Sequence, residues 1–298
     1  MIIDGQKLAF KKQSQLKKEI NRLKKINQKT PLLITFVAQE DKEGLLYTKL
    51  KKETALKLGI NFKKILFSFK KKEEIYLLLN KVLKKEEFAG LLIQKPNKQL
   101  IKQYFKSKKE FKRWWLKASL KIPKKKDVDC LTIANLGLLV SGLPYFYPAT
   151  VKAIFHLLRF IYKREEKLAG KEIVVIGSSE ILGKPLALLL RDKGATVCLC
   201  GSSCQDLKST VREKEIVISA VGQPKLITAE MVKKGAVVID AGISSVGKEV
   251  VGDVDFSKVA PITSFITPVP DGVGPLTVIS LMENLVQAFK ESGKKENK

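Results

Sequence analysis

Acid–base chemistry has few candidate side chains in this chain, because the sequence contains a single histidine. His156 lies in an apolar helical stretch and is best explained as a core or partly buried structural residue. A proton donor or acceptor would therefore have to be a lysine, a tyrosine or a carboxylate. The stretch from Leu46 to Ile60 offers two of these one helical turn apart, Tyr47 and Lys51.

Helical periodicity places Lys51 at the border of the inward face of that stretch. At about 100° per residue, Lys49 and Lys52 point the other way. Periodicity alone leaves the alternative that Lys51 is an ordinary solvated lysine. The inward half of the circumference would hold Leu46, Tyr47, Leu50, Lys51, Thr54, Ala55 and Leu58.

Two further polar residues stand where a ligand could reach them. Gln94 comes at the carboxyl end of the apolar run LLIQKP, and the carboxyl ends of buried strands face a crevice where ligands bind. Asp129 stands in the loop KDVDC ahead of a long apolar helix, with a turn or helix cap as its alternative role. The stretch 267–277, TPVPDGVGPLT, has prolines and glycines that would let a flat ligand approach the backbone.

A strand–turn–helix pattern at 171–185 predicts a dinucleotide site. The run KEIVVIG ends in a glycine turn at Gly177, and the helix that follows has Gly183 in its first turn. Backbone N–H groups at such a helix start can bind a pyrophosphate. The next strand ends in Cys-Gly-Ser-Ser at 200–203, without the acid that usually binds the ribose hydroxyls of NAD. This pattern favours NADP, or a site that does not discriminate.

The elements around these residues form two α/β halves. In the first half, strands expected at 31–38, 61–68 and 89–96 alternate with helices, as in a small three-layer domain. The second half has five apolar runs typical of a doubly wound parallel sheet, at 171–177, 195–200, 215–222, 236–242 and 264–270. Besides the helix around Lys51, helices are expected at 6–27, 72–85, 97–109 and 148–170.

The totals describe a globular protein with room for two cores. The chain has 298 residues, of which 45% are apolar. No apolar run approaches the ~20 residues of a membrane span, and the N-terminus lacks the features of a signal peptide, so we expect a cytoplasmic protein without a membrane partner. The four cysteines have neither paired spacing nor a histidine nearby, which argues against a zinc site, and no metal is expected.

The formal charge of +26 belongs to one half of the chain. Residues 1–170 carry 40 Lys and Arg against 15 Asp and Glu, whereas residues 171–298 carry 16 against 15. Of the 56 basic residues, 50 are lysines, with few arginines or aromatic residues between them to grip bases. We therefore expect nucleic acid to bind only non-specifically, with strong salt dependence.

Ordered motifs along nearly the whole chain resemble those of the bifunctional methylenetetrahydrofolate dehydrogenase/methenyltetrahydrofolate cyclohydrolase family. The family's YxxxK helix appears as Tyr47 to Lys51, its strand glutamine as Gln94, and its KDVDG loop as residues 126–130. Further partial matches are IxDG at 3–5, GRSxxVGxP at 177–185, VIDVGIN at 238–244, VGDV at 251–254 and TPVPGGVGPMT at 267–277.

This resemblance implies an α/β fold of two three-layer αβα domains with a cleft between them. A catalytic, folate-binding domain would span 1–145, completed by a C-terminal helix at 275–298, and a Rossmann-like NAD(P) domain would span 146–274. The expected reactions are NADP-dependent oxidation of 5,10-methylenetetrahydrofolate to 5,10-methenyltetrahydrofolate and hydrolysis of the latter to 10-formyltetrahydrofolate. The resemblance also implies a homodimer, and the basic half would suit folates with polyglutamate tails.

The resemblance assigns catalysis and folate contacts to Tyr47, Lys51, Gln94 and Asp129. Lys51 would take a proton from water, which requires that burial lower its pKa well below the usual value of about 10.4. Gln94 would orient the amine. The expected cofactor contacts are Gly177, Ser178, Ser179, Ser202 and Ile243, and the further folate contacts are Pro270, Gly272, Gly274 and Pro275.

Several residues depart from the family pattern. Ser178 replaces an arginine that could clamp a phosphate, which leaves NAD open as a cofactor. Cys130 and Asp271 replace glycines, Gly44 replaces a frequent serine, and Gly201 replaces a frequent histidine. Two alternatives follow: a degenerate member that retains one of the two activities, or a polyanion-binding protein on the same fold.

Overall fold

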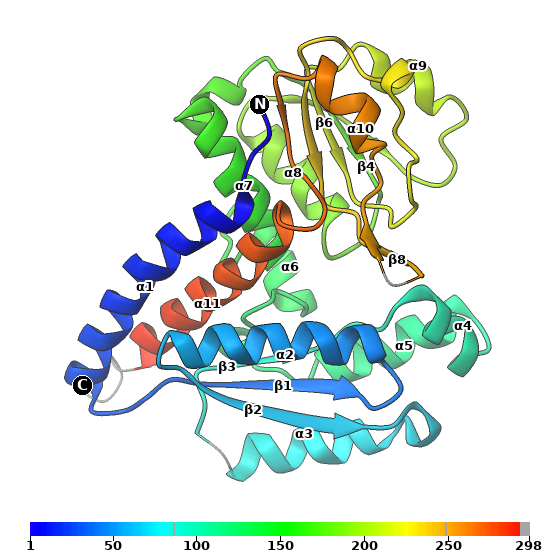
Figure 1. Ribbon diagram of the computed structural model, residues 1–298. Coiled ribbons are helices and arrows are strands. Elements are labelled where there is room, and N and C mark those ends of the chain that lie inside the picture. Colours follow the sequence, from blue (N-terminus) through cyan, green and yellow to red (C-terminus); the bar gives the residue numbers. More distant parts are fainter. Residues whose placement is uncertain (86, 248, 293–298) are drawn as a thin grey trace. The chain divides into compact units, whose positions relative to one another are not determined.

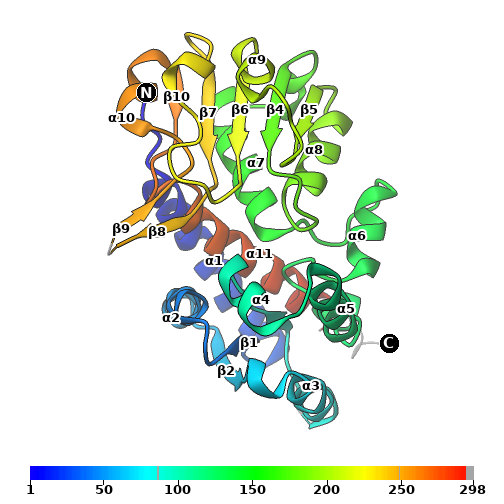
Figure 2. The ribbon, with the colours of Figure 1, turned by 90° about the vertical axis from the view of Figure 1, so that its right-hand side faces the viewer.

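The computed structural model describes residues 1–85, 87–247 and 249–292 and divides into two compact units (Figures 1 and 2). We call them the three-stranded unit, which holds Gln13–Tyr147 and the described residues from Leu281, and the five-stranded unit, which holds Met1–Lys12 and Pro148–Ser280. Helices α1 (Gly5–Asn27) and α11 (Val273–Ser292) contribute residues to both. Within the described ranges, no helix is both long and apolar enough to cross a bilayer.

The three-stranded unit is built on a parallel sheet with the order β2-β1-β3. β1 (Leu32–Ala38) is central and buried, whereas β2 (Asn61–Phe67) is an edge strand with several exposed side chains, and β3 is Gly90–Ile93. Helix α2 (Lys42–Lys57) lies on one face of the sheet and α3 (Glu74–Lys85) on the other (Figures 1 and 2). The unit also has α4 (Lys98–Tyr104), α5 (Lys108–Ser119), α6 (Ile133–Val140) and two 3-10 turns, Phe69–Lys71 and Lys124–Lys126.

One face of this sheet is closed by an aromatic core. Alternate residues of β1 (Ile34, Phe36 and Ala38) pack there with side chains of α3 and α5. The rings of Phe67 and Phe69 meet edge to face with centroids 5.3 Å apart, a favoured geometry for aromatic pairs. The packed sheet thus fixes the positions of the residues that follow its strands at the carboxyl end.

The five-stranded unit is the doubly wound parallel sheet that the apolar runs predict. Its strand order is β10-β7-β6-β4-β5, and every pairing is parallel. The chain leaves β4 toward β5 on one side and continues through β6, β7 and β10 on the other, so the order reverses between β4 and β6. The strands are β4 (Glu172–Ile176), β5 (Thr196–Cys200), β6 (Ile216–Ser219), β7 (Val237–Asp240) and β10 (Phe265–Ile266).

Helices and a short ribbon complete this unit. Ile2 forms a parallel bridge with Ile266, so the first residues of the chain extend the β10 edge. The ribbon pairs β8 (Ser244–Val246) with β9 (Glu249–Val251) in antiparallel fashion. The helical elements are α7 (Ala149–Tyr162), α8 (Gly183–Asp192), α9 (Leu207–Arg212) and α10 (Phe256–Val259), with 3-10 turns at Glu165–Leu168, Ala229–Met231 and Ala260–Ile262.

Two helix predictions were wrong in extent. The helix expected over 97–109 is broken between α4 and α5, because the Ser107 side chain accepts a hydrogen bond from the backbone N–H of Glu110 and starts a new helix. The helix expected over 148–170 ends at Tyr162, where Lys163 adopts a φ of 67°. His156 is partly buried on α7, as predicted.

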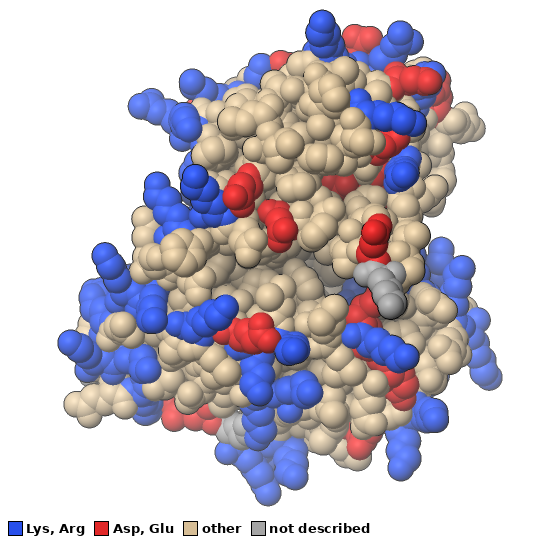
Figure 3. Space-filling view, in the orientation of Figure 1, with Lys and Arg blue, Asp and Glu red and all other residues tan. Residues whose placement is uncertain are grey.

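Charged side chains are dispersed over the surface that Figure 3 shows. Lysines and arginines lie among acidic and uncharged residues on this face, and they do not gather into one basic stripe. Such a distribution is typical of a solvated surface and differs from the clustered basic face of a dedicated nucleic-acid binder.

Candidate active site

Lys51 lies within the buried face of α2, which is lined by small residues. Its side chain is 4% exposed, and the other buried residues of the helix are Gly44, Thr48 and Ala55. The expectation that Leu46 and Leu50 face inward was wrong, because they are 67% and 42% exposed. Small side chains bring the helix backbone close to the sheet, so the stripe that contains Lys51 is buried in place of the leucine stripe.

The structure brings Lys51 together with Gln94 and Tyr47. The Lys51 Nζ donates a hydrogen bond of 2.7 Å to Gln94 Oε1 and lies 5.0 Å from the centre of the Tyr47 ring. Gln94 follows β3 directly, and its backbone N–H donates to the Phe36 carbonyl at 2.7 Å, which extends the sheet to this point. The residue after the strand is therefore held as firmly as the strand itself.

The charge state of Lys51 is set by burial and by Asp129. Burial lowers the pKa of the Lys51 ammonium from its ordinary value, and the Asp129 carboxylate acts in the opposite direction. Desolvation is the larger cause, so the neutral amine is favoured relative to a surface lysine. Within the three-stranded unit, Lys51 thus interacts with each of the other residues predicted for catalysis. It donates a hydrogen bond to Gln94, lies near the Tyr47 ring, and is influenced by the charge of Asp129.

A helix cap fixes the start of α2 and accounts for one departure from the family pattern. The buried Asp41 carboxylate accepts a hydrogen bond of 2.9 Å from the backbone N–H of Gly44. A Cβ atom at position 44 would lie 2.2 Å from that carboxylate and 3.0 Å from Gln94 Cγ. A serine at this position would therefore require Asp41 to move, and glycine suits the cap as it stands.

The loop that carries Asp129 is built around a second aspartate. Asp127 is fully buried, and its carboxylate accepts hydrogen bonds of 2.9 Å from the backbone N–H groups of Leu131 and Thr132 and from Asn135 Nδ2. Cys130 lies in this turn with a φ of 55°, a conformation that favours glycine. The backbone thus keeps the shape for which the family uses glycine.

Sequence reasoning missed the side chains that hold this loop. From α11, Asn284 Nδ2 donates to the carbonyls of Val128 and Tyr147, both at 2.8 Å. Asp127 itself could have been noticed, because the motif DVDC contains a second acid two residues before Asp129. Asn135 and Asn284 carry no local signal, since their partners are set by the fold.

The predicted dinucleotide turn lies at the carboxyl end of β4. Gly177 has a φ of 111°, and a Cβ atom there would lie 2.5 Å from the carbonyl oxygen of Ala220. A Cβ atom at Gly183 would lie 1.6 Å from the carbonyl oxygen of Gly177, so the start of α8 packs directly on the turn. Ser179 Oγ accepts a 3.4 Å hydrogen bond from the Gly183 N–H. Two glycines thus make the compact strand–turn–helix that suits a pyrophosphate.

Two departures from the family pattern are neighbours in this turn. A Cβ atom at Gly201 would lie 2.9 Å from Ser178 Oγ. Ser178, which replaces the family's arginine, and Gly201, which replaces its histidine, therefore lie next to each other in space. Ser178 and Ser202 are exposed, and Ile243 is 54% exposed. These side chains are available to a cofactor at the carboxyl edge of the sheet.

The proline- and glycine-rich stretch is partly helical, because α11 already begins at Val273 and so contains Gly274 and Pro275. Gly272 is required by packing: a Cβ atom there would lie 2.3 Å from the Pro268 carbonyl oxygen, and its own carbonyl oxygen lies 1.8 Å from the place of a Cβ atom at Gly5. Asp271 is exposed with a φ of 73°, and the Val269–Pro270 peptide bond is cis.

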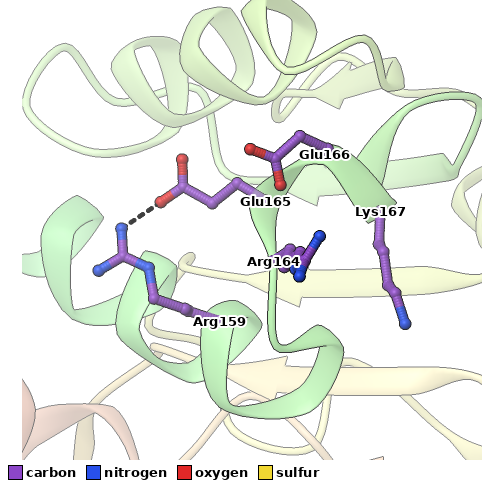
Figure 4. Close-up of a pocket in the computed structure, with 5 residues that line it drawn as sticks. All are labelled: Arg159, Arg164, Glu165, Glu166 and Lys167. Carbon is purple, nitrogen blue, oxygen red and sulfur yellow. Dashed lines mark hydrogen bonds and ion pairs between the residues drawn. The ribbon is translucent and has the colours of Figure 1, made fainter.

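Two concave surfaces lie elsewhere and contain none of the predicted site residues. One, of about 700 Å³, follows the end of α7 (Figure 4), where Glu165 pairs with Arg159 and, at 2.9 Å, with Lys193. Burial raises the pKa of Glu165, but hydrogen bonds from Lys193 and Arg159 outweigh it, so the pKa is lowered. The other, of about 450 Å³, lies near the starts of β1 and β2 and includes Lys29, Lys126 and Phe289.

Comparison with known proteins agrees with this arrangement. Family models for the "Tetrahydrofolate dehydrogenase/cyclohydrolase, catalytic domain" and for its "NAD(P)-binding domain" match residues 3–129 and 148–293. The bifunctional protein FolD of Exiguobacterium sibiricum is 37% identical over 291 residues, with 97% of this chain and 99% of the relative covered. That of Caldanaerobacter subterraneus is 35% identical over 290 residues, with 97% of each covered.

Solved structures give the same result. The methylenetetrahydrofolate dehydrogenase-cyclohydrolase of Trypanosoma brucei, complexed with NADP cofactor and inhibitor, superposes with a TM-score of 0.88 at 32% identity, with 98% of each chain covered. The bifunctional FolD enzyme of Campylobacter jejuni gives 0.85 at 31% identity, with 98% of this chain and 99% of that one covered. This chain therefore belongs to the tetrahydrofolate dehydrogenase/cyclohydrolase family.

Proposed function

We propose that this chain is a bifunctional folate enzyme that oxidises 5,10-methylenetetrahydrofolate with a nicotinamide cofactor and hydrolyses the methenyl product to 10-formyltetrahydrofolate. The observation that carries the proposal is the buried Lys51 amine, held at 2.7 Å by Gln94. A desolvated amine beside an uncharged carboxamide is suited to proton transfer and has no evident structural purpose.

In the hydrolytic step, Lys51 is the proton acceptor. Water adds to the methenyl carbon, a carbon–oxygen bond forms, and the proton passes to the Lys51 amine. A carbon–nitrogen bond then breaks as the carbinol hydroxyl releases its proton to solvent and becomes the formyl carbonyl. The Lys51 ammonium gives its proton to the leaving nitrogen, so one proton is released per turnover. The hydrogen bond to Gln94 orients the amine lone pair, and the Asp129 carboxylate stabilises the ammonium that forms, in keeping with its effect on the pKa of Lys51.

In the oxidative step, a nicotinamide cofactor held by the five-stranded unit would supply the acceptor for a hydride from the one-carbon bridge of the substrate. The glycine turn at Gly177 suits a dinucleotide, because its glycines let the strand, the turn and the start of α8 pack closely, and backbone N–H groups at a helix start can bind a pyrophosphate. We assign cofactor contacts to Gly177, Ser178, Ser179, Ser202 and Ile243, and folate contacts to Tyr47, Lys51, Gln94, Asp129, Pro270, Gly272, Gly274 and Pro275. The folate-binding domain is assigned to 1–145 with 275–298, and the NAD(P) domain to 146–274.

Initial rates on the purified protein test this function. Cofactor reduction and methenyl hydrolysis are followed at two wavelengths, with NADP and with NAD. We propose NADP as the better substrate, because no acid follows β5 to repel a 2′-phosphate, although Ser178 cannot clamp one as arginine would. Hydrolysis without cofactor reduction would support the degenerate alternative, and the absence of both activities would refute the proposal.

The hydrolytic rate should rise with pH. Because Lys51 reacts as the neutral amine, the rate is expected to increase about tenfold per pH unit below the pKa of the buried ammonium and to level off above it. The measurement is kcat for methenyl hydrolysis at constant ionic strength, corrected for the uncatalysed reaction. A rate that does not change between about pH 6 and about pH 9 would argue that another group is the base.

The basic excess of residues 1–170 supports a preference for folates with polyglutamate tails. At low salt, KM should fall as the tail lengthens, and the difference should shrink as salt screens the lysines.

The polyanion-binding alternative rests on the same charge, but the dispersed lysines of Figure 3 favour weak binding. Selective binding of one nucleic acid at physiological salt would support that alternative.

The resemblance supports a homodimer, for which sedimentation should give twice the chain mass of 33.4 kDa.

A further inference from the structure

Asp253 is a buried carboxylate to which the proposed reactions assign no role. It is fully buried, and it accepts hydrogen bonds from residues 219–223, which comprise the last residue of β6 and the loop after it and which we call the 219–223 loop. Ser219 Oγ donates to its Oδ2 at 2.8 Å, the Val221 N–H donates to Oδ2 at 2.7 Å, and the Gln223 N–H donates to Oδ1 at 2.7 Å. One side chain thus fixes the backbone of the whole loop.

That loop lies where a doubly wound sheet binds its ligand. It follows β6, and the strand order reverses between β4 and β6, which makes the carboxyl ends of these strands the switch point of the sheet. The loop touches the dinucleotide turn, because a Cβ atom at Gly177 would lie 2.5 Å from the Ala220 carbonyl oxygen. On its other side, a Cβ atom at Gly222 would lie 3.3 Å from the Ile243 carbonyl oxygen. The loop therefore separates two sets of proposed cofactor contacts and touches both.

A second buried acid, Asp240, packs beside this arrangement. Its carboxylate accepts hydrogen bonds of 2.9 Å from the N–H groups of Gly242 and Val254. A Cβ atom at Gly242 would lie 2.1 Å from the Asp253 carboxyl carbon, and one at Gly252 would lie 2.1 Å from Asp240 Oδ2. Each acid thus packs on a glycine beside the other, and Ile243 follows directly after one of these glycines.

We propose that Asp253 is a positioning residue for the nicotinamide cofactor, acting through the 219–223 loop and through Gly242. This inference rests on the proposed function for its reaction, but its contacts lie entirely within the five-stranded unit. The hydrolytic step uses no cofactor, so the two activities should depend on Asp253 to different degrees.

The substitution Asp253→Asn tests whether Asp253 positions the cofactor site, because asparagine has the same shape as aspartate and one acceptor oxygen fewer. In either orientation of the carboxamide, its NH2 group would face the N–H of Val221 or of Gln223. Two donors cannot pair, so part of the loop must move away. The matched control is Asp255→Asn, which changes a nearby buried aspartate whose carboxylate contacts Ser257 at 3.1 Å and Lys258 at 3.3 Å.

Asp253→Asn is expected to raise the KM for NADP about tenfold, to weaken NADPH binding to a similar extent, and to change methenyl hydrolysis less than about twofold. NADPH binding is followed by its fluorescence without folate, so it tests Asp253 even if the wild-type protein lacks dehydrogenase activity and the proposed function fails. Asp255→Asn should leave all three quantities within about twofold of wild type.

Two results would overturn the inference: an unchanged NADPH affinity in folded Asp253→Asn, or equal losses in both activities, which would indicate a general structural role. If Asp253→Asn does not fold, Ser219→Ala replaces it, since this change removes one donor and keeps the carboxylate. The KM for NADP should then rise by about two- to fivefold with hydrolysis unchanged, and a KM equal to that of wild type would also refute the role.

Discussion

Lys51→Met should lower the hydrolysis of methenyltetrahydrofolate by about 100- to 10,000-fold, the range typical for loss of a general base. Methionine follows the path of the lysine side chain as far as Cε and lacks only the terminal amine, and its apolar character suits the buried site on α2, so the variant should fold. Oxidation of methylenetetrahydrofolate depends mainly on positioning and should fall by less than about tenfold. The measurement is kcat for each step on the same protein preparation.

The matched control is Lys52→Met, which changes the next residue of the same helix on its exposed side. Both activities should stay within about twofold of wild type, because the side chain of Lys52 is exposed to solvent. If Lys51→Met hydrolysed its substrate at the wild-type rate, the proton acceptor would have to be another group. Equal losses in both variants would instead indicate a general effect of surface charge on folate binding.

Asp127→Ala should destabilise the three-stranded unit by about 3 kcal/mol or more. The change leaves two buried N–H groups and the Asn135 carboxamide without their acceptor, and each unsatisfied buried donor costs about 1–3 kcal/mol. The loop that carries Asp129 should then lose its shape, so both activities should fall as well. Urea unfolding followed by circular dichroism gives the stability change as a shift of the midpoint.

Asp129→Ala separates the two roles within this loop. Its side chain is only partly buried, so its removal should change stability by less than about 1 kcal/mol while hydrolysis is lost. If Asp127→Ala proved as stable as the wild type, water would have to replace its carboxylate in the buried turn. An equal loss of stability in both variants would show that Asp129 also holds the loop together.

Much of the architecture could be predicted from local patterns. Apolar runs identified the buried strands of both sheets, since strands buried on both faces are continuously apolar, whereas the edge strand β2 contains two lysines and several exposed side chains. Tyr47, Lys51 and Gln94 could be singled out because a helical turn and a strand end are local features. Residue contacts now show that Lys51 and Gln94 meet, while their roles in the reaction stay predictions.

The face of α2 could not be read correctly, because periodicity analysis follows large apolar residues. Gly44, Thr48 and Ala55 face the sheet since their small size permits close approach, and this preference depends on the partner surface. The supports of the Asp129 loop were equally hidden. Asn284 lies 156 residues from Val128 in sequence, and no local pattern links a carboxamide to so distant a carbonyl.

The desolvation of Lys51 has a consequence for folding itself. In the unfolded chain this amine is protonated up to a pKa of about 10.4, whereas burial lowers its pKa in the native state. Between these two pKa values, the chain therefore releases a proton from this residue as it folds, so a lower pH opposes folding there. The cost of this residue to the free energy of folding is largest below its native-state pKa. The cost declines as the pH rises toward the pKa of the unfolded chain. Through Lys51, both the free energy of unfolding and the rate of hydrolysis should therefore increase as the pH rises.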